Sequence, residues 1–222
     1  MSARRQESGD NHLSSPLMGE GQGGVEIEVH LKEKAEDGII VIGASKGGIR
    51  AVGTILAGLP RRFLLPVVVV LHRMPMTSDL LVTILQSDSA LPVSEPEDKD
   101  PIEAGRVYVA PADYHLLMED GRFALSVDEP VSYSRPSIDV LFTAAADAFG
   151  KGVTAILLTG FNEDGAQGMV RVKQNGGRTI VQKPDTAEAP EMPQSAIDAG
   201  AADKVLSLQA IAEYICREAP EW

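Results

Sequence analysis

Short runs of apolar residues alternate along this chain with longer segments in which apolar residues recur every three or four positions. The short runs are rich in Val and Ile, which is typical of strands buried on both faces of a sheet. The predicted strands lie at 39–42, 66–71, 93–95, 106–109, 153–158 and 179–182. The longer segments have the spacing of amphipathic helices. The predicted helices lie at 49–59, around 80–85, and at 138–149, 165–174, 192–199 and 208–218.

Local signals support the ends of several of these elements. Pro60 closes the first helix, Thr77 or Ser78 is expected to cap the second, and Ser137 is expected to cap the third. The segments 115–118 and 122–127 flank a turn with a glycine, so they predict an antiparallel hairpin. Alternating strands and helices predict an α/β fold, a doubly wound, mainly parallel sheet with helices on both faces and the hairpin as an antiparallel addition.

The first 37 residues differ from the rest of the chain. They are polar and rich in Gly and Ser, so we predict a flexible N-terminal tail over residues 1–37. The apolar and polar residues of 25–31 alternate, which fits either a short strand or part of a linker. The folded domain is expected to span residues 38–218.

Composition narrows the classes of function. The formal net charge of −12 argues against binding to nucleic acid and to anionic membranes, both of which favour clustered Lys and Arg. No apolar run approaches the length of about 20 residues that spans a bilayer, and no apolar segment follows Arg4 and Arg5 to form a secretory signal. The single cysteine, Cys216, fits a reducing compartment. We therefore expect a cytoplasmic protein.

Three residues with catalytic chemistry each follow a predicted strand. Ser45 follows 39–42, His72 follows 66–71, and Asp164 follows 153–158. Parallel strands bring their carboxyl ends to one edge of a sheet, where ligands bind in open α/β folds. A hydroxyl, an imidazole and a carboxylate at one edge have the chemistry of a nucleophile, its base and the residue that orients the base.

Each of these residues also has a simpler interpretation. Ser45 lies in a glycine-rich turn, where a serine most often forms the turn or caps a helix. The same turn contains a lysine, which is typical of phosphate-binding loops, although its spacing fits neither of the common phosphate motifs. His72 at a strand end is more often structural, and Asp164 before a glycine more often forms a turn or cap.

Six stretches in order along the chain resemble the catalytic domain of the CheB family of chemotaxis protein-glutamate methylesterases. The resemblance runs from about Gly38 to Leu208. The stretches are 42–48 with Ser45, 71–75 with His72, 104–111, 135–142, 158–166 with Asp164, and Met192 with Pro193.

The resemblance implies a Ser-His-Asp triad of Ser45, His72 and Asp164. It further implies hydrolysis of glutamate methyl esters, and deamidation of glutamine, on the cytoplasmic helices of a methylated chemoreceptor. Neither a metal nor an organic cofactor is expected. Candidate oxyanion or substrate contacts are Lys46, Phe161, Arg73 and Met192.

The sequence departs from that family in three respects. The family usually carries a receiver domain before the catalytic domain, and residues 1–37 are too few and too polar for one. A separate regulatory protein is therefore a possible partner. Lys46 stands where the family usually has Thr or Ala, and it would either stabilise the oxyanion, block the site or point to solvent. Arg73 is the third departure, and its charge would bind an acidic part of the substrate.

Two other functions fit the same residues. One is a catalytically silent binding module of a chemosensory-like pathway. The other is an esterase redirected to a different ester, which an enclosed apolar pocket at Ser45 would favour.

Overall fold

The computed structural model describes residues 38–73 and 78–219. The predicted tail, the 25–31 segment and the Thr77 cap lie outside the described residues. The domain limits 38–218 stay a prediction.

The described strands form one large sheet and one hairpin. The seven parallel strands of the sheet lie in the order β3-β4-β2-β1-β7-β8-β9. They are β1 (Ile39–Ala44), β2 (Val67–Leu71), β3 (Val93–Ser94), β4 (Val107–Val109), β7 (Val153–Leu157), β8 (Arg178–Gln182) and β9 (Lys204–Leu206). The hairpin pairs β5 (His115–Glu119) with β6 (Arg122–Ser126) in antiparallel register. This architecture confirms the predicted fold class.

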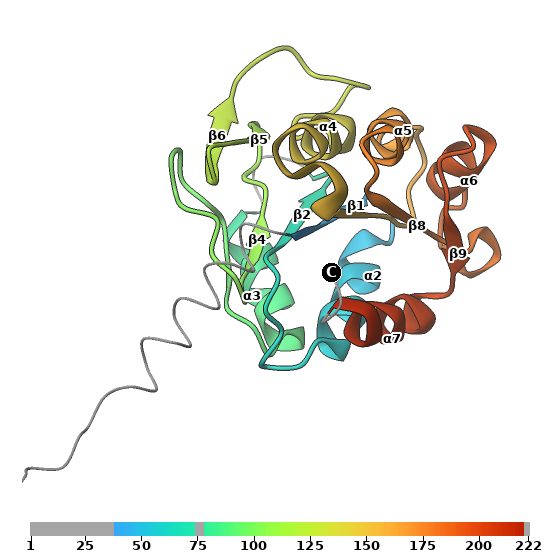
Figure 1. Cartoon of the computed structure of the whole chain (residues 1–222), viewed down its shortest axis with the longest axis horizontal. Helices are drawn as coiled ribbons and strands as arrows, with labels where there is room; N and C mark the ends of the chain where they lie inside the picture. Colours follow the sequence, from blue (N-terminus) through green and yellow to red (C-terminus); the bar gives the residue numbers. More distant parts are fainter. Residues whose placement is uncertain (1–37, 74–77, 220–222) are drawn as a thin grey trace, which may run out of the picture.

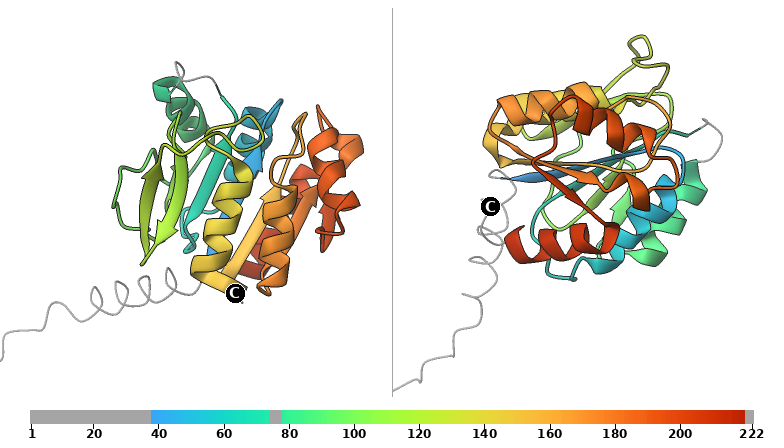
Figure 2. Two further views of the ribbon diagram at one scale, coloured as in Figure 1. Left: turned by 90° about the horizontal axis from the view of Figure 1, so that it is seen from above. Right: turned by 90° about the vertical axis from the view of Figure 1, so that its right-hand side faces the viewer.

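Helices cover both faces of the sheet (Figure 1). They are α2 (Gly48–Gly58), α3 (Ser78–Asp88), α4 (Ile138–Phe149), α5 (Ala166–Gln174), α6 (Glu191–Asp198) and α7 (Leu208–Glu218), with short 3-10 turns at Gly150–Gly152 and Pro184–Thr186. Helices α4 and α5 lie above the sheet in Figure 1, and α2, α3 and α7 lie below it. The two further views in Figure 2 show the same layers.

The alternation of side chains along each strand explains this two-layer core. In β1, Ile39 and Val41 pack in the cluster that includes α4 and α5, whereas Ile40 and Ile42 pack in the cluster that includes α2 and α7. Every residue of β1, β2 and β7 is buried. A strand buried on both faces needs a continuous apolar run, which is the signal that the sequence carries.

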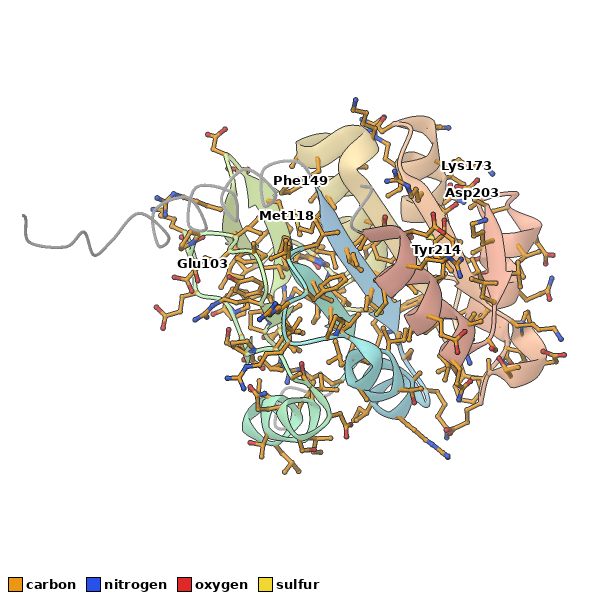
Figure 3. The ribbon with its side chains drawn as sticks, turned by 60° about the horizontal axis from the view of Figure 1, so that its bottom comes forward. Glu103, Met118, Phe149, Lys173, Asp203 and Tyr214 are labelled. Atoms are coloured by element: carbon orange, nitrogen blue, oxygen red, sulfur yellow. The ribbon has the colours of Figure 1, made fainter. Side chains whose placement is uncertain are left out.

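The hairpin extends the core beyond the sheet. Met118 of β5 and Phe149 at the end of α4 belong to one apolar cluster and lie near each other in Figure 3. Predicted and observed element ends agree within about three residues, and β9 is the described strand that the apolar pattern missed. Its three residues sit at the sheet edge, with Lys204 and Val205 exposed, so they leave no apolar run to detect.

Candidate active site

The candidate residues meet where the direction of the chain across the sheet reverses. Strand β1 lies between β2 and β7, and Ser45, His72 and Asp164 follow these three strands. Helix α2, after β1, covers one face, and α5, after β7, covers the other (Figure 1). Such a switch point opens a crevice at the carboxyl ends of the strands, where open α/β sheets bind ligands.

The turn that holds Ser45 depends on its glycines. The Ser45 N–H donates to the Thr159 carbonyl at 2.9 Å, and the Ser45 carbonyl accepts from Gly48 N–H at 2.8 Å. Gly47 has φ +76°, a conformation that favours glycine, and a Cβ there would lie 2.8 Å from the Glu188 side chain. A Cβ on Gly43 would lie 2.2 Å from Ile138, so this glycine lets α4 approach β1. The glycine-rich pattern therefore serves both the turn and the packing behind it.

His72 and Asp164 form a hydrogen-bonded pair. The two atoms joined are His72 Nε2 and Asp164 Oδ2, 2.7 Å apart. A carboxylate can only accept, so Nε2 carries the proton and Nδ1 is the nitrogen that can act as a base. The Ser134 hydroxyl lies 3.5 Å from Nδ1. The imidazole is 12% exposed and the Asp164 side chain is fully buried, so the pair is shielded at one end and open at the other.

The buried Asp164 carboxylate is held by the beginning of α4. It accepts hydrogen bonds from the Ser137 hydroxyl at 2.8 Å, from Ile138 N–H at 2.8 Å and from Asp139 N–H at 3.0 Å. Burial alone would raise the pKa of Asp164, but the His72 bond and these donors outweigh it, so the pKa lies below its ordinary value. Asp164 is therefore a carboxylate at neutral pH, as the orienting residue of a triad must be.

Ser45 and His72 line the same surface groove, whose volume is about 650 Å³. The described residues give the Ser45 hydroxyl no hydrogen bond, either to His72 or to another side chain. A nucleophile and its base are often poorly aligned without substrate and tighten when it binds. The structure thus brings all three predicted residues to one site and bonds two of them.

The side chains of Lys46 and Phe161 lie against each other beside Ser45. The Lys46 ammonium lies 5.6 Å from the centre of the Phe161 ring and 3.9 Å from a Glu188 oxygen. Both side chains are more than half exposed. Neither backbone N–H donates to a described residue, so both can point at a ligand.

Arg73 and Met192 lie differently from these two. The Arg73 side chain is only 7% exposed, and its guanidinium binds Glu95 and donates to the Ala110 carbonyl at 3.0 Å. Met192 is fully buried against Gly160, where a Cβ would lie 2.5 Å from its terminal methyl group. Its N–H donates to the Gly160 carbonyl at 2.9 Å. Both residues therefore brace the site from behind, and their suggested contact with substrate stays a hypothesis.

Two further residues support the site without having been singled out for it. Thr159 connects three loops: its hydroxyl donates to the Lys46 carbonyl at 2.8 Å and accepts from Ala189 N–H at 2.9 Å. Ser137 was expected only to cap α4, but it also donates to Asp164. A polar residue directly after a buried strand was the available signal for Thr159, whereas the link from Ser137 to Asp164 spans 27 positions and has no local signal.

Residues 38–73 and 78–219 contain no group of three or more His, Cys, Asp or Glu side chains that could hold a metal ion. In the same part of the chain, no helix is both long and apolar enough to cross a bilayer.

The fold and the site together define a hydrolase, and comparison with known proteins narrows this class. The family model described as CheB methylesterase matches residues 40–215. The chain belongs to the CheB methylesterase family.

Two relatives and one solved structure show the extent of the similarity. A Leptospira interrogans protein named for protein-glutamate methylesterase and protein-glutamine glutaminase activity is 48% identical over 179 residues, covering 80% of this chain and 93% of the relative. The protein of the same two activities from Thermotoga maritima is 37% identical over 181 residues, covering 80% of this chain but 53% of that protein. The crystal structure of the Thermotoga maritima CheB methylesterase catalytic domain matches with a TM-score of 0.78 and 36% identity, covering 81% of this chain and 97% of the domain.

Proposed function

We propose that this protein is a protein-glutamate methylesterase and protein-glutamine glutaminase that acts on the cytoplasmic helices of methylated chemoreceptors. The observation that carries the proposal is the His72–Asp164 hydrogen bond beside Ser45 at the switch point of the sheet. Family membership supports the choice of substrate.

In the proposed mechanism, Ser45 Oγ attacks the ester carbonyl while His72 Nδ1 takes its proton. The tetrahedral intermediate collapses to a glutamyl ester of Ser45, and His72 returns the proton to the departing methanol, or to ammonia when the substrate is an amide. Water, deprotonated by His72, then cleaves the acyl-enzyme to release the glutamate carboxylate and Ser45. Asp164 fixes the imidazole and stabilises its charged form at each step.

The negative oxygen of the intermediate needs donors. The backbone N–H groups of Lys46 and Phe161 are the proposed pair, because neither donates to a described residue. Each donor of this kind contributes about 3 kcal/mol of transition-state stabilisation when well placed.

Two surface hollows support a protein segment, rather than a small ester, as the substrate. The groove at Ser45 is lined by side chains that are themselves exposed, among them Ile49, Leu80 and Ile84. A second hollow of about 410 Å³ lies between Tyr133 and Phe161, both well exposed. An enclosed apolar pocket, which would favour a redirected esterase, does not occur at Ser45 in the described residues. Exposed apolar side chains around a reactive group suit the apolar face of a docked helix.

We further propose a cytoplasmic location, where the ester-bearing helices of the receptor lie. Family membership and the acidic composition of the chain support this location.

The test is methanol release from methylated receptor cytoplasmic fragments. Wild type is compared with Ser45→Ala and with His72→Gln, whose amide can still donate to Asp164. Ser126→Ala, on the hairpin, is the matched control because among the described residues its hydroxyl accepts only from the local Asp128 N–H. Release by wild type and the control alone supports the proposal. Release by Ser45→Ala would exclude that nucleophile, and binding of the fragment without release by folded wild type would favour a silent binding module.

A further inference from the structure

Helix α5 begins without a cap of its own. Its N-cap residue is Gly165, with φ +98° and no side chain, and its first turn contains no acidic residue. A Cβ at Gly165 would lie 2.6 Å from Leu157 and 2.7 Å from Ile138, so the position is closed to the usual capping residues. Within this turn, Ala166 N–H donates to the Glu163 carbonyl at 3.1 Å and Met169 N–H donates to the Gly165 carbonyl at 2.9 Å. The N–H groups between them, of Gln167 and Gly168, therefore need an acceptor from another part of the chain.

Asp139, in the first turn of α4, supplies this acceptor. Its Oδ1 accepts from Gly168 N–H at 2.6 Å. The two helices can meet closely because Gly168 has no side chain, and a Cβ there would lie 2.6 Å from Phe142 and 3.1 Å from the Asp139 backbone. One carboxylate of α4 thus caps α5 from the side.

The arrangement is reciprocal. Asp164, one residue before the cap of α5, accepts from the N–H groups of Ile138 and Asp139 at the beginning of α4. Asp164 therefore holds the start of α4, which carries Asp139, and Asp139 holds the start of α5, which follows Asp164 directly. A shift of the Asp139 carboxylate would move the segment that carries Asp164, and with it the hydrogen bond to His72.

From this exchange we infer that Asp139 is a positioning residue for the Asp164–His72 pair. The inference rests on the proposed function, in which that pair acts on Ser45. Asp139 contacts neither the substrate nor His72. It acts by holding in place the segment that carries Asp164.

The ionisation of Asp139 supports the geometric argument. The pKa of Asp139 is raised to about 6. Burial is the main cause and the neighbouring Asp164 charge adds to it, while the N–H groups of Gly168, Gly165 and Gln167 oppose the rise. Asp164 is the ionisable group that acts on Asp139 across the contact between α4 and the start of α5. The Asp139 carboxylate is buried at a cost, and the N–H groups from which it accepts offset part of that cost. This fits a role as a hydrogen-bond acceptor at the start of α5.

Three substitutions separate the position of this acceptor from its charge. Asp139→Ala removes the acceptor, Asp139→Glu keeps the charge but moves it by one methylene, and Asp139→Asn keeps an oxygen at the same place. The matched control is Asp147→Ala, also on α4. Asp147 accepts from Arg171 of α5 at 2.7 and 3.0 Å near the exposed far end of the helices, so its loss weakens the same pair of helices away from the site.

The expected result is a loss of kcat without a change in KM. Misplacing a catalytic group by about 1 Å lowers the rate by about 100-fold, so we expect losses of about 10- to 100-fold for Asp139→Ala and Asp139→Glu. Asp139→Asn should restore most of the rate, and Asp147→Ala should leave it unchanged. The downfield proton NMR signal of His72 Nε2–H, which reports the bond to Asp164, should be lost or shifted in the first two variants and kept in the other two.

Two outcomes would overturn the inference. One is a wild-type kcat and an unchanged His72 signal in folded Asp139→Glu. The other is an equal loss in Asp139→Asn and Asp139→Ala, since the retained oxygen would then contribute nothing. If Asp139→Ala does not fold, Asp139→Glu and Asp139→Asn decide alone. If wild type releases no methanol, the proposed function fails, but the His72 signal still tests the role of Asp139.

Discussion

Two cations follow two of the proposed catalytic residues directly, and the structure uses them in opposite ways. Lys46 follows Ser45, is 53% exposed and reaches Glu188 only at 3.9 Å. Arg73 follows His72, is 7% exposed and is held by Glu95 and the Ala110 carbonyl. The two positions looked alike in the sequence, as departures from the family pattern beside the chemistry.

Burial decides what each charge does. An exposed ion pair contributes about 0–1 kcal/mol to stability and is screened by salt. A buried cation must keep its partners, because an unpaired buried charge is strongly destabilising. Arg73 therefore ties the end of β2 to the ends of β3 and β4 beside His72, whereas the Lys46 ammonium stays solvated beside Ser45.

The largest expected effect is on the free energy of unfolding of Arg73→Met. This change leaves Glu95 and the Ala110 carbonyl without the guanidinium, and breaking one side of a buried pair costs about 3–5 kcal/mol. Since Glu95 is a quarter exposed, we expect the lower end of that range. Urea unfolding measures it, with Lys46→Met as the control. A loss for Lys46→Met as large as that for Arg73→Met would contradict the comparison.

A second contrast concerns two carboxylates, Asp139 and Asp164, whose pKa values move in opposite directions. The folded pKa of Asp139 is raised, so its contribution to stability is complete below pH 3.8 and is lost as the pH rises through about 6. Asp164 has a lowered pKa, so its contribution is present above pH 3.8 and is lost as the pH falls through the folded value.

We therefore expect the stability of wild type relative to Asp139→Asn to fall by up to about 3 kcal/mol between pH 4 and pH 7, from 1.36 kcal/mol per pKa unit. Urea unfolding of both proteins at a series of pH values measures this difference. A difference that is constant over that range would show that Asp139 titrates normally.

Glu95→Gln sharpens the first comparison, because it keeps an acceptor for Arg73 and removes only the charge. We expect a loss of about 1–2 kcal/mol, between that of a neutral hydrogen bond and that of a charged one. The loss should change little with added salt, since the Arg73 side chain is buried. Glu188→Gln is the exposed counterpart, and a larger loss there than at Glu95 would reverse the assignment.

The sequence was sufficient for the sheet and for the three polar strand ends. Buried parallel strands need continuous apolar runs, and a chain that alternates strands with helices must place their carboxyl ends together. Strand β9 was missed because it pairs through its backbone at an exposed edge of the sheet, where its side chains need no apolar pattern.

The supports of the site lay beyond the sequence because they depend on contacts between distant positions. Nothing near Arg73 indicates that Glu95 and the end of β4 will enclose it. Nothing near Asp164 indicates that its carboxylate oxygens will accept hydrogen bonds from the N–H groups at the start of α4. Local patterns give the place of a residue in an element, but its burial and partners follow only from packing.

The smallest expected effect tests the exposed side of the comparison. Lys46→Thr should change kcat/KM for methylated receptor fragments by less than about tenfold, or 1.4 kcal/mol, because the ammonium is solvated and lies over the Phe161 ring rather than in the groove. The backbone N–H of residue 46 remains, so the proposed oxyanion donor is kept. A steady-state assay at low and high salt measures the effect, with Lys151→Thr, at an exposed position in the turn before β7, as the control. A large gain in rate would mean that Lys46 obstructs the site. A loss of more than 100-fold would instead make its charge part of the chemistry.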